Sequence, residues 1–226
     1  MAKIVVISGA GISAESGLKT FRDDDGLWRS HSFYELASPQ AWEKQPELVL
    51  EFYNERRQRA LAAQPNPAHL ALAELESHHD VVIVTQNVDD LHERAGSSQV
   101  IHLHGELAKV RSTSDSALIY SANGKPTQIG DLCELGSQLR PHIVWFGEMV
   151  MDFDIAIQEV SRADKVMVVG TSLAVYPAAS LLDFAKQADE KILVTKDIDG
   201  EPPQSFQWLK GNAAQWVPKI VSRWLL

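Results

Sequence analysis

Two histidines, His102 and His104, lie two positions apart at the end of a short apolar run, and Gly105 follows them. Residues i and i+2 of a strand point to the same face, so both imidazoles would face one site. An imidazole titrates near neutral pH and can act as a general base, although a histidine near a strand end is more often structural. From spacing alone, either histidine remains the candidate base.

Amide and carboxylate side chains follow a second apolar run, Val81–Val84, in Gln86, Asn87 and Asp89. A short helix is predicted over 89–95, ending at Gly96. Asp89 could therefore cap that helix or contact a ligand, and the spacing favours neither.

The N-terminal run Ile4–Ile7 is followed by Gly9, Ala10 and Gly11, and then by Ser13. A strand, a glycine turn and a helix start are typical of a phosphate-binding site, although a glycine pair is also common in plain tight turns. Further on, Phe21, Arg22 and Trp28 lie in a polar loop long enough to fold over a ligand. After the run Val166–Val169, small and hydroxyl residues recur in Gly170, Thr171 and Ser172, where a plain turn is the alternative interpretation.

These runs alternate with helix-like segments, which predicts an α/β, Rossmann-type parallel sheet with helices on both faces plus a smaller inserted lobe. The predicted strands are Ile4–Ile7, Val81–Val84, Val100–Ile101, Ile143–Val144, Val166–Val169 and Ile192–Val194. Ligands of such sheets bind at the carboxyl ends of the strands, so the motifs would share one crevice. The large lobe is expected over 1–30, 63–105 and 140–226, and the small lobe over 31–62 and 106–139.

Composition restricts the partners. The chain has 226 residues, 45% of them hydrophobic, a net charge of −9 and a single cysteine, Cys133. No basic block suggests a nucleic-acid partner, and no apolar stretch approaches the roughly 20 residues of a membrane span. An internal disulfide is excluded, and we expect a reduced, cytoplasmic setting.

The motifs together resemble the signature of the sirtuins, NAD-dependent protein-lysine deacylases. The resemblance rests on GAGIS-A-x-SG with TFR and GLW, TQNVDDLHERAG at 85–96, HLHG at 102–105, RPHIVWFGE at 140–148, GTSLAVYPA at 170–178 and GNAAQWVPKIV at 211–221. These motifs stand in the family's order across nearly the whole chain.

The resemblance implies that NAD is a co-substrate and that the product is O-acyl-ADP-ribose, with release of nicotinamide. It places the general base at His104, and Asn87 and Asp89 against nicotinamide and ribose. Arg22 would steady the pyrophosphate and Phe21 would shield the intermediate. The implied cofactor residues are Gly9, Ala10, Gly11, Ser13, Phe21, Arg22, Trp28, Gln86, Asn87, Asp89, Gly170, Thr171, Ser172, Lys196 and Ala213.

The same resemblance implies a protein substrate, an acylated lysine in an extended peptide segment. Val144, Trp145, Phe146 and Gly147 would pair with that peptide through the backbone, which predicts loose sequence preference. Tyr53 and Arg56, three apart on a helix predicted over 47–63, resemble the Tyr-x-x-Arg pair of the subgroup that removes succinyl and other acidic acyl groups. Without the family, a solvated arginine beside a half-buried tyrosine would be preferred.

The chain departs from the family at the structural zinc. The positions expected to be cysteine are Ser112, Asp115, Cys133 and Gly136, and one thiolate does not make a tetrahedral site. We therefore predict no zinc, with Leu118, Ile119, Tyr120, Ile129 and Leu132 as candidates for compensating packing. Lys196, where the family has an asparagine, puts adenosine affinity in question.

Deacetylation and desuccinylation of proteins are the leading hypothesis. ADP-ribosyl transfer or NAD hydrolysis would use the same pocket with another nucleophile. A catalytically weak NAD sensor or partner-binding module is the alternative from a different class.

Overall fold

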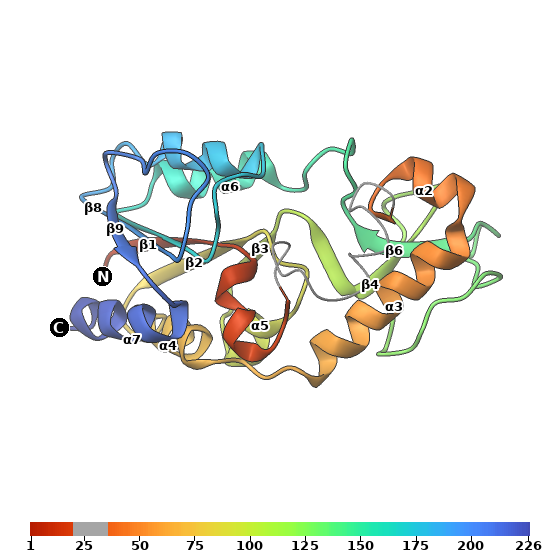
Figure 1. The fold of residues 1–226 in the computed structure, drawn as a ribbon, viewed down its shortest axis with the longest axis horizontal. Helices are drawn as coiled ribbons and strands as arrows, with labels where there is room; N and C mark the ends of the chain where they lie inside the picture. The colour runs from red at the N-terminus through yellow and green to blue at the C-terminus, as the bar shows by residue number, and fades with distance from the viewer. Residues whose placement is uncertain (20–35) are drawn as a thin grey trace.

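Six parallel strands form the larger sheet of the computed structural model, which describes residues 1–19 and 36–226 (Figure 1). The strands lie in the order β3-β2-β1-β7-β8-β9. Their bounds are β1 Lys3–Ser8, β2 Asp80–Thr85, β3 Val100–His102, β7 Lys165–Val169, β8 Glu190–Thr195 and β9 Gln207–Lys210. This arrangement confirms the predicted Rossmann-type sheet; the edge strand β9 was not predicted.

The register of the sheet brings the strand ends together. Ser8 at the end of β1 pairs with Thr85 of β2 and Val169 of β7, and Thr85 pairs with His102 of β3. The chain runs from β1 outward through β2 and β3, and then returns to the other side of β1 for β7, β8 and β9. The edge where this order reverses is where open α/β sheets bind ligands.

Alternating side chains of the strands bury the two faces of the sheet. On one face, Ile4 and Val6 of β1 pack with helices α4 (Pro67–Leu75) and α7 (Ala213–Trp224). On the other face, Val5 and Ile7 pack with α6 (Phe153–Ser161) and the 3₁₀ helix η4 (Ala178–Phe184). Because both faces are covered, the strands read as continuous apolar runs in the sequence.

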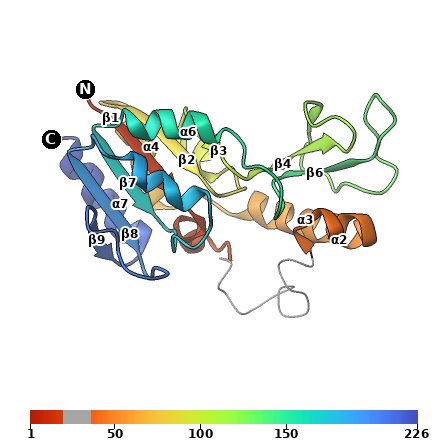
Figure 2. The same cartoon turned by 90° about the horizontal axis from the view of Figure 1, so that it is seen from above.

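A smaller antiparallel sheet lies beside the large one in both views (Figures 1 and 2). It has the order β5-β4-β6, with β4 Gly105–Ser112, β5 Ile119–Ser121 and β6 Leu139–Ile143. Helices α2 (Pro39–Lys44) and α3 (Pro46–Ala62) cover it, burying Phe52 and Tyr53 against Leu107 and Trp145. The prediction that Ile143–Val144 belongs to the parallel sheet is wrong, because β6 pairs antiparallel with β4.

The helix starts follow the local sequence. Asn66 caps α4 through its side chain, which accepts from the Ala68 N–H at 2.9 Å, and Pro67 occupies the first turn. The predicted helix at 89–95 begins later, as α5 (Leu91–Ala95), and ends at Gly96 with a φ of 111°. No helix in the described ranges is long and apolar enough to cross a membrane.

Candidate active site

Two loops cross closely at the carboxyl edge of the sheet. The N–H of Gly9 donates to the carbonyl of Val169 at 2.9 Å, and that of Gly11 to the carbonyl of Gly170 at 2.7 Å. A Cβ atom on Gly170, whose φ is 67°, would lie 2.2 Å from the backbone nitrogen of Ile12. These glycines are therefore required by the packing of one loop on the other, in addition to any role in ligand approach.

The loop after β1 is held by its neighbours. Residues Ala10–Ile12 and Ala14–Ser16 form two 3₁₀ turns, η1 and η2, where the sequence predicts a short helical segment after the glycine turn. The Asn66 side chain donates to the Ile12 carbonyl at 2.7 Å. The carboxylate of Glu15 accepts from the side chain of Asn212 and from the N–H of Ala214, so the loop contacts the first turn of α7.

Asn87 is buried and bonded on three sides. Its backbone N–H donates to the Thr85 hydroxyl at 3.0 Å, and its side-chain nitrogen donates to the Ser13 hydroxyl at 3.1 Å. Its carbonyl accepts from Nδ1 of His102 at 3.0 Å. The sheet edge therefore fixes both the backbone and the side chain of Asn87 beside the glycine loop.

His104 lies next to this loop, two residues beyond the end of β3. Its Nδ1 is 3.0 Å from the carbonyl oxygen of Gln86, so Nδ1 carries the proton. No described residue makes a hydrogen bond to Nε2, which keeps a lone pair for accepting a proton. Burial lowers the pKa of His104, although the bond to the Gln86 carbonyl partly opposes the shift. A neutral imidazole with one available nitrogen suits a general base.

Asp89 is 8% exposed, and its Oδ1 accepts from the N–H of Leu91 at 3.2 Å. Asp89 therefore bonds the N–H of the first residue of α5 from outside the helix. The N-cap is Asp90, which makes no side-chain cap bond, so Asp89 is not the cap of this helix. Burial raises the pKa of Asp89, and the bond from Leu91 and the charge of His102 act in the opposite direction.

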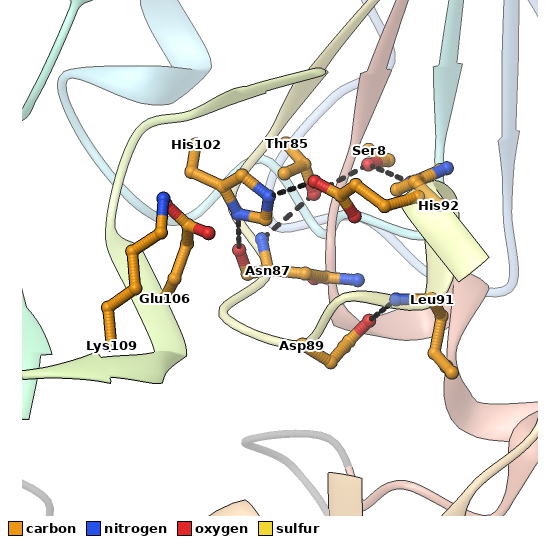
Figure 3. A network of polar contacts seen from close by, with 10 residues as sticks. Ser8, Thr85, Asn87, Asp89, Leu91, His92, His102, Glu106 and Lys109 are labelled. Atoms are coloured by element: carbon orange, nitrogen blue, oxygen red, sulfur yellow. Dashed lines mark hydrogen bonds and ion pairs between the residues drawn. The ribbon is translucent and has the colours of Figure 1, made fainter. Parts of the chain in front are cut away.

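His102 has partners on both ring nitrogens (Figure 3). Its Nε2 is 2.7 Å from the carboxylate of Glu93 on α5. A second set of contacts lies nearby: the Ser8 hydroxyl donates to Thr85 at 2.8 Å and lies 2.9 Å from Nε2 of the buried His92. The sequence indicated His102 only as an alternative base and did not indicate Ser8, Glu93 or His92. Ser8 and His92 are polar residues at buried strand and helix positions, which is the signal that the sequence offers for them; Glu93 is exposed and carries no such signal.

The remaining predicted cofactor residues lie along the same edge. The Thr171 hydroxyl accepts from the Gln86 amide at 3.4 Å, and the Ser172 carbonyl accepts from the N–H of Asp199 at 2.8 Å. Lys196 is exposed directly after β8, and Ala213 is buried at the start of α7. Phe21, Arg22 and Trp28 lie outside the described residues.

The predicted acyl-group residues lie on α3, facing Trp145. Tyr53 is 1% exposed, and its hydroxyl accepts from Nε1 of Trp145 at 3.1 Å. Burial raises the pKa of the Tyr53 phenol to about 12, so the hydroxyl keeps its proton. The guanidinium carbon of Arg56 lies 5.4 Å from the Phe52 ring centroid and 5.8 Å from that of Tyr53.

A carboxylate fixes the segment that follows β6. Glu148 accepts from both terminal nitrogens of Arg140, at 2.6 and 3.1 Å, and from the N–H of Trp145 at 2.8 Å. The Arg140 guanidinium carbon lies 3.2 Å from the Trp145 ring centroid. The N–H of Val144 donates to the His104 carbonyl at 2.9 Å, and that of Phe146 to the Ala37 carbonyl at 3.0 Å.

The two segments expected to carry zinc ligands do meet. Hydroxyl and thiol groups contact one another where the two segments meet: the Cys133 sulfur is 3.3 Å from the Ser112 hydroxyl and 3.1 Å from that of Ser137. Asp115 instead accepts from the N–H of Ala117, within its own turn. Described residues form no group of three or more histidine, cysteine or acidic side chains that could hold a metal.

The apolar compensation predicted for this lobe is wrong for three of its five residues. Ile119 is 44% exposed, Ile129 50% and Leu132 55%, and Leu118 and Tyr120 are only half buried. A short, loop-rich sheet has too little area to bury them. Arg57 of α3 packs there instead, 1% exposed, and donates to backbone carbonyls of the lobe.

A parallel sheet with a glycine loop, a neutral histidine and a buried amide at its carboxyl edge defines a dinucleotide-binding α/β protein. A model of the Sir2 family matches residues 9–177, and the chain belongs to this family, as the sequence predicts. A Helicobacter pylori protein named NAD-dependent protein deacylase is 51% identical over 226 residues, with 98% of each chain covered.

Solved structures agree with this assignment. A Sir2 homologue in complex with NAD is 43% identical, with a TM-score of 0.86 over 98% of this chain and 89% of that one. A Sir2 protein with a deacetylated p53 peptide and 3′-O-acetyl-ADP-ribose is 30% identical, with a TM-score of 0.79 over 97% of this chain and 92% of that one.

Proposed function

We propose that the chain is an NAD-dependent protein-lysine deacylase in which His104 is the general base and Asn87 and Asp89 are the nicotinamide and ribose contacts. The enzyme class and the co-substrate agree with the names of its relatives. The observation that carries the residue assignment is the hydrogen bond from His104 Nδ1 to the Gln86 carbonyl, which leaves Nε2 available beside the buried Asn87.

The described residues fit a bound dinucleotide. Backbone and hydroxyl groups of Ser13, Thr171 and Ser172 lie at the carboxyl edge, next to the crossing of the two glycine loops. NAD would supply the ADP-ribose that accepts the acyl group and nicotinamide as the leaving group. The chain would supply the binding edge, the amide of Asn87 and the base.

His104 fits the proton-accepting step through its tautomer. Since the Gln86 carbonyl can only accept, the proton stays on Nδ1 and the ring orientation is fixed. Burial lowers the pKa of His104, so the imidazole is neutral at pH 7 and its Nε2 can take a proton from a ribose hydroxyl.

For the acyl group, we propose that the pocket takes acidic acyl chains, such as succinyl, as well as acetyl. Trp145 donates to the Tyr53 oxygen, so the Tyr53 hydroxyl hydrogen can point to an acyl carboxylate. Arg56 is half buried, and an arginine can bind a carboxylate through two parallel hydrogen bonds. The substrate would be an acylated lysine in an extended protein segment.

The test is nicotinamide release from NAD with acetyl-lysine and succinyl-lysine peptides. His104→Ala should abolish peptide-dependent release while NAD still binds. Arg56→Met should reduce kcat/KM for the succinyl peptide by roughly tenfold or more and leave the acetyl peptide nearly unchanged, because only the former carries a charge to pair. Arg59→Met, on the exposed side of α3, is the matched control.

The pH profile adds a second check. The base must be neutral, so kcat/KM should fall with acid through a pKa below about 6.5, the ordinary histidine value. Peptide-independent release in the native chain would favour NAD hydrolysis, and an active His104→Ala variant would refute the base assignment. The cytoplasmic setting and the lobe boundaries stay predictions from the sequence.

A further inference from the structure

We propose that His102 is a positioning residue, which Glu93 holds as a doubly protonated cation to keep the Asn87–Asp89 segment in its NAD-binding shape. The inference rests on the proposed roles of Asn87 and Asp89. It assigns a function to the pair of His102 and Glu93, which takes no part in the base step.

The two ring nitrogens of His102 face acceptors only. Nδ1 is 3.0 Å from the Asn87 carbonyl oxygen, and Nε2 is 2.7 Å from a carboxylate oxygen of Glu93 (Figure 3). Neither a carbonyl nor a carboxylate can donate, so both bonds form only when each nitrogen carries a proton. The geometry therefore requires an imidazolium at His102.

The comparison with His104 shows what Glu93 adds. Both histidines direct Nδ1 at a backbone carbonyl of the same segment, that of Asn87 or of Gln86. Within residues 1–19 and 36–226, only His102 has a carboxylate on the opposite nitrogen. One histidine is thus charged and holds the segment, whereas the other is neutral and keeps its Nε2 for chemistry.

The charged groups around His102 agree with this assignment. Burial alone would lower the pKa of His102, but the bond to Glu93 and the charges of Glu93 and Glu106 raise it overall. Lys109 of β4 bonds to Glu106 at 2.6 Å, and its positive charge offsets part of the negative charge of Glu106. His92, from α5, is buried and neutral, because burial places its pKa well below the ordinary value.

The cation acts on the segment in two ways. Its Nδ1–H holds the carbonyl of Asn87, whose N–H and side chain are already fixed by Thr85 and Ser13. Its charge favours the ionised form of Asp89, where burial disfavours it. Loss of the proton from His102 would remove one of the interactions that lower the pKa of Asp89 and would weaken the contact with Asn87.

The test measures the affinity of the full chain for NAD at pH 6 and pH 8. Glu93→Gln should weaken NAD binding by roughly five- to tenfold at pH 8, since a charge-assisted hydrogen bond is about twice as strong as a neutral one. At pH 6 a larger fraction of the imidazole carries its second proton, so part of the affinity should return. His102→Phe cannot donate at any pH, so its loss should persist at pH 6.

The charge state gives a readout independent of binding. Imidazole nitrogen NMR should show His102 doubly protonated at pH 7 and titrating above about 6.5, the ordinary histidine value. In Glu93→Gln the titration should move to lower pH. Glu76→Gln is the matched control, because Glu76 is also a carboxylate that bonds a backbone N–H, that of Ser98 at 2.9 Å, without contacting His102.

The outcomes separate two failures. An equal loss at both pH values in Glu93→Gln, or no loss at either, would refute the positioning role of the cation, as would a His102 that is neutral at pH 7. Asn87→Ala tests the proposed role of Asn87 in NAD binding, on which the inference rests. If Asn87→Ala leaves NAD affinity unchanged, the nicotinamide pocket itself is misplaced, whatever Glu93→Gln does.

Discussion

Replacement of Arg57 by methionine should loosen the small lobe without unfolding the NAD-binding sheet. Arg57 is 1% exposed, and its Nε donates to the Leu107 carbonyl of β4 at 2.6 Å. Its Nη1 donates to the Lys125 carbonyl at 2.8 Å and to the Asn54 side chain at 3.0 Å. One residue of α3 thus bonds both a strand and a distant loop of the lobe.

The magnitude follows from the acceptors left behind. Methionine fills a similar volume but leaves the buried carbonyl of Leu107 without its donor, at about 1 to 3 kcal/mol. The carbonyl of the exposed Lys125 also loses its donor, but water can replace it at a smaller cost. The Nη2 of Arg57 has no hydrogen-bond partner among the described residues, so removing the buried charge returns part of that cost. We expect a net loss of about 1 to 3 kcal/mol, or roughly 5- to 140-fold more frequent opening.

Amide hydrogen exchange, read by mass spectrometry on segments 105–112 and 119–143, measures this opening. Protection in β1, β2 and β7 should stay close to that of the native chain, and NAD should still bind. Arg59→Met is the control, because Arg59 is half exposed and its one ion pair among the described residues is with Glu55, one turn away, so its effect should stay within about twofold. Equal exchange in the two variants would refute the assignment of Arg57 as the link to the lobe.

Two further predictions concern the loop crossing and the cysteine cluster. Gly170→Ala should destabilise the chain by more than about 2 kcal/mol in denaturant unfolding, because a Cβ would lie 2.2 Å from a backbone nitrogen. Gly200→Ala, also at positive φ but with open space around it, should cost only about 1 kcal/mol; equal losses would contradict the close-contact argument. Hydrogen bonding with the Ser112 and Ser137 hydroxyls lowers the pKa of Cys133 to about 7, so alkylation should rise through that pH. Ser137→Ala should move the rise to higher pH, whereas the exposed Ser116→Ala should not; an unchanged profile in both would exclude the serine effect.

The sequence predicted the large sheet well, because its strands are buried on both faces and each reads as an apolar run. Polar residues directly after those runs fell at the carboxyl edge, as parallel topology requires. The antiparallel β6 was misassigned, since the run at Ile143–Val144 has the composition of a buried parallel strand and only its pairing partner distinguishes the two. The edge strand β9 is half exposed and carries little apolar signal.

In the site, the residues of the family motifs were predictable from the sequence, whereas the residues that hold them in place were not. His104 and Asn87 stand in family motifs, whereas Glu93 reaches His102 from another element, across a distance that sequence spacing does not encode. The glycine pair was predicted to make room for phosphate. The structure adds a second reason for it, the close passage of the Gly170 loop, which depends on two segments about 160 residues apart in the chain.

The small lobe shows why apolar compensation was the wrong expectation for the segments that would carry zinc ligands. A metal site is polar at its centre, and the backbone groups around it are already arranged for hydrogen bonding. Ser112, at one of the expected ligand positions, and Ser137, next to another, keep that polar centre satisfied through hydroxyls that both donate and accept. An apolar filling would have left the same backbone groups unpaired, which costs more than the area it buries would return. Hydrogen bonds from Arg57 and the serine cluster are therefore the form of compensation that this backbone permits.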